Sequence, residues 1–307
     1  MKTNLFGAVR PLTTGSRVAL VAPSGILREP AHVRRAEDNV RSFGWIPVLG
    51  ENVSASHAYF AGTDEERITD LNAALRDDDV DAIWCVRGGY GAMRLLRDID
   101  YAALKSNPRP VVGFSDITAL HSAIHRECGI VTFHGPTARG ELSDFSRKHL
   151  VRALIDRTDS CGVAPAGRIL RPGRARGRLA GGNLALVASL MATPWAIDFD
   201  GAILVLEDID EAVYRVDRML RQLLLSGALE RCAGDYAGDF RRPSGETEVD
   251  NRSVDDVIEE AAHDAGIPCF SGARFGHIED QWTIPLGAIA EMDTSDCSLR
   301  VTGATGA

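Results

Sequence analysis

The first half of the sequence alternates short apolar runs with helical patterns, and this alternation restricts the fold more than any other feature. Apolar runs with the length of buried strands occur at 18–22, 46–49, 82–86 and 111–114. Apolar residues at helical spacing occur at 30–43, 64–76, 93–98 and 117–127. Strands that alternate with helices predict an α/β fold, in which an open, mostly parallel sheet carries helices on both faces.

The pattern changes between residues 156 and 177, where Gly and Pro interrupt the sequence and no periodicity is visible. After this segment we expect a strand at 202–206, an exposed loop at 234–252, and helices at 184–191, 213–225 and 253–265. The predicted organisation has three parts: an N-terminal α/β domain (1–156), a linker (157–177) and a smaller mixed α/β C-terminal domain (178–307).

Composition narrows the class of protein. The chain has 307 residues and a net charge of −9, which argues against a nucleic-acid partner because such proteins usually present a basic face. No run of 18 apolar residues occurs, so we expect no membrane span, and the first residues lack the apolar stretch of a secretory signal. The six cysteines form no Cys-x-x-Cys pair and no His-Glu-x-x-His pattern occurs. We therefore predict free thiols, no metal site and a cytoplasmic location.

Ser115 occupies a position suited to chemistry. It follows the apolar run at 111–114, in which Gly113 favours a tight turn, and it precedes the helical pattern at 117–127. The hydroxyl is thus predicted to lie in a strand-to-helix corner at the sheet edge, where helix N–H groups point toward an anion. On these residues alone, the simpler interpretation is that Ser115 or Asp116 caps the helix.

A serine nucleophile needs a base and a carboxylate that orients the base. His277 follows Gly276, and a glycine there permits close approach of the backbone. Glu207 ends the apolar run at 203–206, where a charged group must find a partner or reach water. Each has a structural alternative: His277 as a purely structural histidine, and Glu207 as part of a hydrated acidic turn with Asp208.

The glycine-rich segment GGYG at 88–91 follows the run at 82–86. It lacks the spacing of the nucleotide-phosphate loop and of the dinucleotide loop. Its more specific use is to expose backbone N–H groups to an oxyanion. In a parallel sheet, this segment and Ser115 fall at the same carboxyl edge.

An ordered set of motifs resembles the LD-carboxypeptidase family of serine peptidases, which includes the microcin C immunity-type hydrolases. The motifs are RGGYG at 87–91, GFSDIT at 113–118, HGP at 134–136, GGNL at 181–184, LED at 206–208, YRVDRML at 214–220, and GH at 276–277 with PLG at 285–287. Each motif is weak alone, but the set keeps one order and covers the chain from residue 18 to about 293.

This resemblance implies a catalytic triad. Ser115 is then the nucleophile, His277 the general base and Glu207 the carboxylate that orients the base. Ser115 belongs to the predicted N-terminal domain, whereas Glu207 and His277 belong to the C-terminal one. The active site is therefore expected in a cleft between the domains.

The resemblance also implies an oxyanion hole and a reaction. The N–H of Asp116 and the glycine-rich loop would bind the oxyanion, with Gly89 as the preferred loop donor and Gly88 as the next. The family implies release of terminal D-alanine from murein tetrapeptide in cytoplasmic peptidoglycan recycling. It implies no cofactor and no metal, a small peptide as partner, and a homodimer.

Two alternatives remain open at this stage. The first is hydrolysis of aminoacyl or peptidyl nucleotides, as in the microcin C immunity-type enzymes. Those enzymes carry a stacking aromatic residue before Gly-Gly-Asn, but 161–180 contain no Trp, Tyr or Phe, which leaves Trp195 or Trp282 for such a role. The second alternative is a non-catalytic small-molecule binding module, because a fold alone does not determine function.

Two features stay unassigned. The segment at 234–252 departs from the usual family pattern and bears on the shape of the pocket. Several arginines have chemistry suited to a substrate carboxylate, and the sequence offers no basis for choosing among Arg87, Arg139, Arg215 and Arg274.

Overall fold

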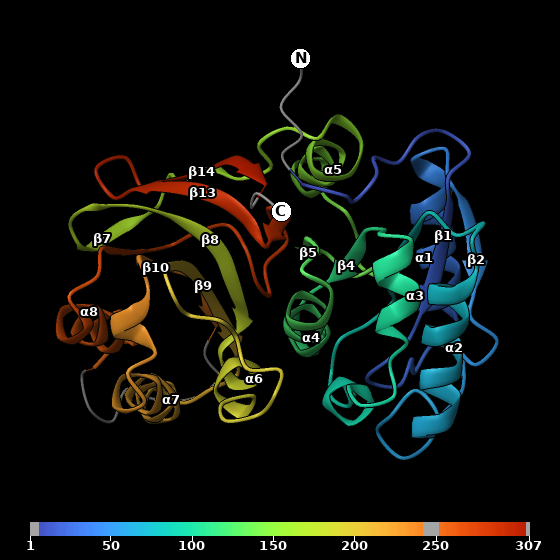
Figure 1. Ribbon diagram of the computed structural model, residues 1–307, viewed down its shortest axis with the longest axis horizontal. Coiled ribbons are helices and arrows are strands. Elements are labelled where there is room, and N and C mark those ends of the chain that lie inside the picture. Colours follow the sequence, from blue (N-terminus) through green and yellow to red (C-terminus); the bar gives the residue numbers. More distant parts are fainter. Residues whose placement is uncertain (1–5, 242–251, 305–307) are drawn as a thin grey trace.

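Two β-sheets organise the chain, whose computed structural model describes residues 6–241 and 252–304 (Figure 1). The strands of the first sheet are, in spatial order, β12 (Ile284–Leu286), β5 (Thr132–His134), β4 (Val111–Gly113), β3 (Ala82–Cys85), β1 (Arg17–Val21) and β2 (Ile46–Leu49). All neighbours are parallel except β12, which runs antiparallel to β5. The predicted parallel sheet of the first half is confirmed.

The helices of the first half are α1 (Pro30–Ser42), α2 (Asp64–Arg76), α3 (Tyr101–Ser106), α4 (Thr118–Cys128) and α5 (Asp144–Val151). The chain moves outward from β1 to β2 and then returns past β1 to β3. Because such crossovers are right-handed, this reversal puts α1 on one face of the sheet and α2, α3 and α4 on the other. The carboxyl ends of β1, β3 and β4 consequently meet at one edge.

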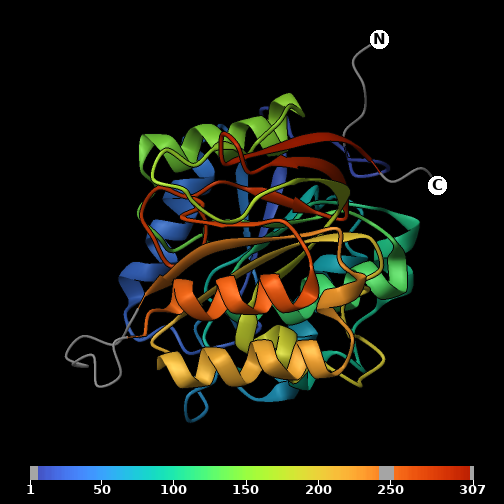
Figure 2. The same ribbon diagram turned by 90° about the vertical axis from the view of Figure 1, so that its left-hand side faces the viewer.

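The second sheet belongs to the second half of the chain. Its strands, in spatial order, are β6 (Gly162–Val163), β14 (Ser298–Ala304), β13 (Ala288–Asp293), β8 (Arg174–Asn183), β9 (Ala202–Ile209), β10 (Gly234–Arg241), β11 (Cys269–Ser271) and β7 (Arg168–Arg171). Its helices are α6 (Leu184–Ser189), α7 (Val213–Leu225) and α8 (Val254–Ala265). Figure 2 shows α7 and α8 side by side in front of this sheet, and α6 also packs against α7.

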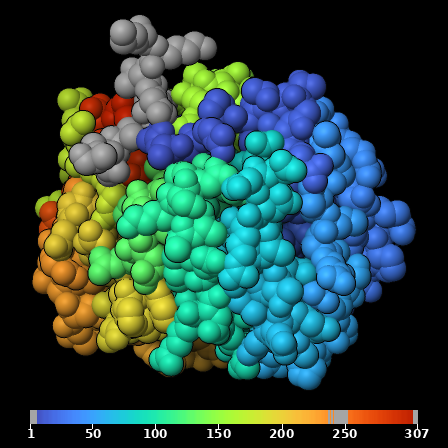
Figure 3. All heavy atoms as spheres, turned by 45° about the vertical axis from the view of Figure 1, so that its right-hand side comes forward, coloured from blue at the N-terminus to red at the C-terminus, as the bar shows by residue number. Residues whose placement is uncertain are grey.

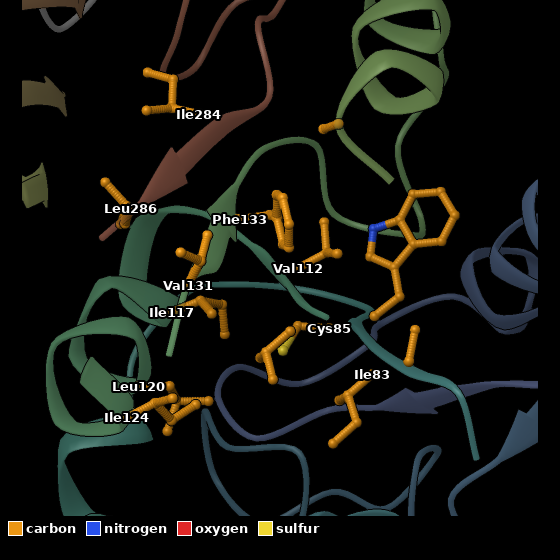
Figure 4. Packing of buried hydrophobic residues seen from close by; sticks show 14 of the residues in the cluster. Ile83, Cys85, Val112, Ile117, Leu120, Ile124, Val131, Phe133, Ile284 and Leu286 are labelled. Carbon is orange, nitrogen blue, oxygen red and sulfur yellow. The ribbon is translucent and has the colours of Figure 1, made fainter. Parts of the chain in front are cut away.

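Strand β9 lies between two hydrophobic clusters, as the alternation of side chains along a strand requires. Ile203 and Val205 join the larger cluster, which continues into the first sheet, whereas Leu204 and Leu206 join the cluster beneath α7 and α8. In Figure 4, Ile284 and Leu286 of β12 lie beside Phe133 of β5. The two sheets therefore share one continuous core. On the face shown in Figure 3, the yellow segment of the second half of the chain packs against the green segment of the first half.

Several sequence predictions need correction. The segment 157–177 is not devoid of regular structure, because it forms β6, β7 and the start of β8. The helix expected at 93–98 is only a 3₁₀ turn over Ala92–Leu95, and α3 begins later. Of the expected loop at 234–252, residues 234–241 form β10, while 242–251 lie outside the described residues. Pairing with distant strands overrides the local Gly and Pro signals in these segments.

Strand β12 was not expected at all. It leaves the second half of the chain and completes the edge of the first sheet beside β5. Three residues of a motif that contains proline carry no strand signal by themselves. Within the described residues, no helix is long and apolar enough to cross a membrane.

Candidate active site

Ser115 lies in a sharp corner between a strand and a helix, as the sequence predicts. It follows β4 by one residue and opens a 3₁₀ turn, Ser115–Ile117, that leads directly into α4. Its φ of +64° lies in the left-handed region, which is unusual for a residue other than glycine and is typical of strained functional turns. The helix-cap interpretation is wrong, because no side-chain cap is formed at the start of the turn or of α4.

His277 and Glu207 form a close polar pair. The Nδ1 atom of His277 lies 2.7 Å from Oε2 of Glu207, although the two residues are 70 positions apart in the chain. The Glu207 side chain is fully buried near the end of β9, whereas the His277 side chain is 17% exposed. A buried carboxylate accepts from an imidazole N–H, so Nδ1 carries the hydrogen and Nε2 is left as the basic nitrogen.

Gly276 allows this pair to form. It has a φ of +104°, and a β-carbon at this position would lie 2.9 Å from Cβ of Glu207. Any other residue would therefore meet both backbone strain and a steric clash. The Gly-His pattern in the sequence thus has a packing cause.

Phe114 connects the pair with the corner. Its ring centroid lies 4.8 Å from that of His277, with the rings at an interplanar angle of 63°. Phe114 precedes Ser115, so this contact places the imidazole beside the serine corner. The structure therefore brings the three predicted residues to one place, where the two halves of the chain meet.

The glycine-rich loop lies directly against Ser115. A β-carbon at Gly88 would stand 3.0 Å from Cβ of Ser115 and 3.2 Å from its Oγ. The Gly25 N–H donates to the Gly88 carbonyl at 3.0 Å, and Gly89 has a φ of +109°. The N–H of Gly89 has no acceptor among the residues that the structure describes. It is therefore free to bind a ligand, as an oxyanion donor must be.

Asp116 has a second role, which the sequence analysis missed. Its Oδ2 accepts from the Ser24 hydroxyl at 2.6 Å and from the Ala92 N–H at 2.8 Å. Burial raises the pKa of the Asp116 carboxyl. One side chain thus holds together the loops that follow β1, β3 and β4. The signal was present, since Ser24 and Asp116 both follow strands of one parallel sheet at the same edge.

The Gly-Gly-Asn motif connects α4 to the second sheet. A β-carbon at Gly182 would lie 2.4 Å from Oγ1 of Thr118, and the Asn183 N–H donates to that oxygen at 2.9 Å. Asn183 Nδ2 in turn donates to Asp208 at 2.9 Å. Burial raises the pKa of Asp208 to about 6. These bonds hold the serine corner beside the strand that carries Glu207.

A buried histidine, His121, contacts the strand that leads to Ser115. His121 Nε2 contacts the Gly113 carbonyl at 2.9 Å, and burial lowers the pKa of His121 to about 4. His125 follows it by four residues, a spacing suited to metal ligation that the sequence analysis overlooked. Among residues 6–241 and 252–304, no group of three or more His, Cys, Asp or Glu side chains could hold a metal ion.

Comparisons with known proteins place these features in context. Residues 18–135 match the family model "LD-carboxypeptidase N-terminal domain", and residues 176–292 match "LD-carboxypeptidase C-terminal domain". The chain is 36% identical to the "Probable murein peptide carboxypeptidase" of Bacillus subtilis, over 94% of this chain and 92% of that protein. It is 34% identical to the murein tetrapeptide carboxypeptidase of Pseudomonas aeruginosa, over 90% and 93%.

Solved structures give the same picture. The muramoyltetrapeptide carboxypeptidase from Oxalobacter formigenes superposes with a TM-score of 0.83 at 31% identity, covering 94% of this chain and all of that one. The microcin C7 self immunity protein MccF superposes with a TM-score of 0.86 over 97% of this chain and 99% of that one. Because the identity to MccF is only 21%, this similarity shows a shared fold and no more.

Proposed function

The chain belongs to the LD-carboxypeptidase family, and on that premise we propose that it releases the terminal D-alanine of murein tetrapeptide by cleaving the L,D-peptide bond. The observation that carries the proposal is the pairing of His277 with Glu207 beside the corner that holds Ser115. A base with an orienting carboxylate next to a strained serine is the arrangement that serine acyl transfer needs.

We propose Ser115, His277 and Glu207 as the catalytic triad. The Nδ1–H of His277 is held by Glu207, so Nε2 accepts the proton as Ser115 Oγ attacks the carbonyl carbon. His277 then returns this proton to the nitrogen of the leaving D-alanine, and an acyl-enzyme remains on Ser115. Water, deprotonated by the same histidine, hydrolyses the ester and regenerates the serine.

The N–H groups of Gly89 and Asp116 are the proposed oxyanion donors, and Gly88 is the next candidate. The close contact of the loop with Ser115 supports this assignment. Each such donor contributes about 3–4 kcal/mol to transition-state binding in other serine hydrolases. The proposed mechanism uses no metal and no cofactor.

The direct test is to incubate the protein with murein tetrapeptide and to measure D-alanine release by mass spectrometry. We expect turnover by the unmodified protein and none by the Ser115→Ala variant, with the same unfolding temperature for both. Full activity of the variant would exclude the serine mechanism. A fluorophosphonate probe separates the remaining alternative, since a non-catalytic binding module would leave Ser115 unlabelled.

The alternative function, nucleotide hydrolysis, would need an aromatic side chain that stacks on the base, and Trp195 and Trp282 are the two candidates. Trp282 is only 1% exposed, and the half-buried Trp195 donates from Nε1 to Glu127 at 3.1 Å. Neither observation favours a stacking surface for a base, which supports the murein peptide as substrate. Incubation with an aminoacyl sulfamoyl adenosine tests this choice, because faster cleavage of that compound would reverse it.

Three further proposals follow from the family. We propose a homodimer, which light scattering after size exclusion would test, and a cytoplasmic location, which cell fractionation would test.

We also propose that 1–156 and 178–307 form two domains around the segment 157–177. The family models end at residue 135 and resume at residue 176, which supports a boundary in this region.

A further inference from the structure

A cavity of about 280 Å³ opens beside the candidate active site. Phe114, which precedes Ser115, and Ile278, which follows His277, both line it. The remaining walls come from α1 and from the segments 136–141 and 279–281. The cavity therefore borders the site on the side where both halves of the chain contribute residues.

Arg139 lines this cavity, and no carboxylate in the part of the chain that the structure describes pairs with it. The residue is half-buried, and its backbone N–H is bonded to the Val86 carbonyl at 3.3 Å, next to the glycine-rich loop. Its Nε is buried and has no hydrogen-bond partner among the described residues. Its Nη1 atom lies 3.4 Å from Nε2 of His32. A half-buried guanidinium is costly unless an opposite charge, from the protein or from a ligand, pairs with it.

Arg87 does not line the cavity, but its charge acts on Arg139. It immediately precedes Gly88, its Nη1 donates to the Ile26 carbonyl, and it has no ion pair among the described residues. Burial lowers the pKa of Arg139, and the positive charges of Arg87 and Arg35 lower it further. Within residues 6–241 and 252–304, neither Arg87 nor Arg139 forms an ion pair with a carboxylate.

The other two candidate arginines are already satisfied. Arg274 pairs with Asp280 at 3.1 Å, and its guanidinium lies 4.9 Å from the ring centroid of Phe145. Arg215 pairs with Glu211 at 3.5 Å, and its side chain is 53% exposed. Ion pairing therefore distinguishes Arg87 and Arg139 from Arg215 and Arg274, which the sequence alone does not do.

The acidic residues on the cavity wall do not neutralise Arg139. Glu141 is 83% exposed and pairs with Arg35 at 3.3 Å, and Glu279 is exposed to water. Glu29 acts on Arg139 through space, without an ion pair. In a chain with a net charge of −9, a cation without a carboxylate partner in this cavity favours the binding of an anionic group there.

We propose that Arg139, supported by Arg87, binds the terminal carboxylate of the peptide substrate in this cavity. The inference rests on the proposed carboxypeptidase function. The terminal carboxylate lies one residue beyond the scissile bond, within about 4 Å of it along the chain. It must therefore enter a space that borders Ser115. A guanidinium binds a carboxylate through two parallel hydrogen bonds, which an amide cannot replace.

The test compares murein tetrapeptide with the same peptide ending in D-alanine amide. For the unmodified protein, we expect amidation to lower kcat/KM by about 10- to 100-fold, the range for a charged hydrogen bond. Arg139→Gln should lower kcat/KM on the acid by a similar factor and respond little to amidation. If amidation lowered kcat/KM of Arg139→Gln by the same factor as for the unmodified protein, the inference would be overturned. An unchanged kcat/KM of Arg139→Gln on the acid would also overturn it.

Matched variants separate recognition from folding. Arg139→Lys keeps the charge but loses the paired geometry, so its kcat/KM on the acid should fall between the other two proteins. Arg41→Gln serves as the control, because Arg41 pairs with Glu37 on an exposed part of α1; its kcat/KM should not change. Unfolding temperatures of all variants show whether each one folds.

A binding arm distinguishes failure of this inference from failure of the proposed function. If the unmodified protein releases no D-alanine, the function is wrong, and carboxylate recognition is then judged by calorimetry on the Ser115→Ala protein. Tighter binding of the acid than of the amide, lost with Arg139→Gln, supports the inference. Equal binding of both peptides, or no binding of the acid, overturns it.

Discussion

Gly276 approaches Glu207 so closely that a β-carbon on it would lie 2.9 Å from the β-carbon of the glutamate. This contact connects the loop that carries His277 with the strand that carries its carboxylate partner. The 2.7 Å contact between His277 and Glu207 thus depends on a glycine in a backbone conformation that other residues rarely adopt.

Gly276→Ala should reduce kcat by at least about 100-fold, because a displacement of the base by one ångström costs that much. It should also lower the free energy of unfolding by about 1–3 kcal/mol through backbone strain. Gly266→Ala is the control: Gly266 also has a positive φ, +73°, but nothing lies within 4 Å of its β-carbon position. That variant should lose stability and keep full activity; equal activity of the two variants would contradict the prediction.

Glu207→Gln should lower kcat by up to about 10⁴-fold while leaving KM nearly unchanged. The amide has the shape of the carboxylate but cannot stabilise the imidazolium that forms on His277, and it offers the wrong hydrogen-bond pattern to Nδ1. Steady-state kinetics on murein tetrapeptide measures the effect. A loss of less than tenfold would show that Glu207 does not act through His277.

Ser24→Ala should loosen the edge of the first sheet. The Ser24 hydroxyl donates to the buried Asp116 carboxylate at 2.6 Å, and its loss leaves a buried charge with one donor fewer. We expect a loss of about 1–3 kcal/mol in the free energy of unfolding, measured in urea. We also expect reduced kcat, because Asp116 follows Ser115 directly. Ser42→Ala, which removes an exposed hydroxyl bonded to the Asn39 carbonyl, should change neither quantity.

Stability should depend on the titration of Asp208. Burial raises the pKa of this carboxyl from 3.8 to about 6, so between these values the folded protein binds more protons than the unfolded chain. The contribution of Asp208 to the free energy of unfolding therefore falls as the pH rises from 4 to 6, by about 3 kcal/mol at most, and is constant above that window.

The Asp208→Asn variant isolates this contribution, because the other titrating groups remain. Unfolding in urea at several pH values between 4 and 7 should show a smaller fall in stability with pH for the variant than for the unmodified protein. Parallel curves for the two proteins would contradict the predicted titration.

Local sequence was sufficient for much of the first half of the chain. The apolar runs around Ile83 and Val112 form parallel strands, since buried strands need continuous apolar character and the helices between them need amphipathic spacing. The corner at Ser115 was also predictable, because a strand that ends at a glycine before a helical pattern leaves few paths for the backbone. The helix expected at 253–265 forms as α8, and the Ser253 oxygen caps it by accepting from the Asp256 N–H.

Tertiary structure decided what depends on distant partners. The strand at Ile284–Leu286 exists because it completes the edge of the first sheet beside β5, and β6 and β7 exist because they complete the second sheet. The contact between Glu207 and His277, which are 70 residues apart, depends on folding. So does the difference between Arg274, which forms an ion pair with Asp280, and Arg139, which lies away from such a partner. Sequence patterns report local propensity and burial, whereas pairing of strands and charges is set by contacts between segments that only the complete core brings together.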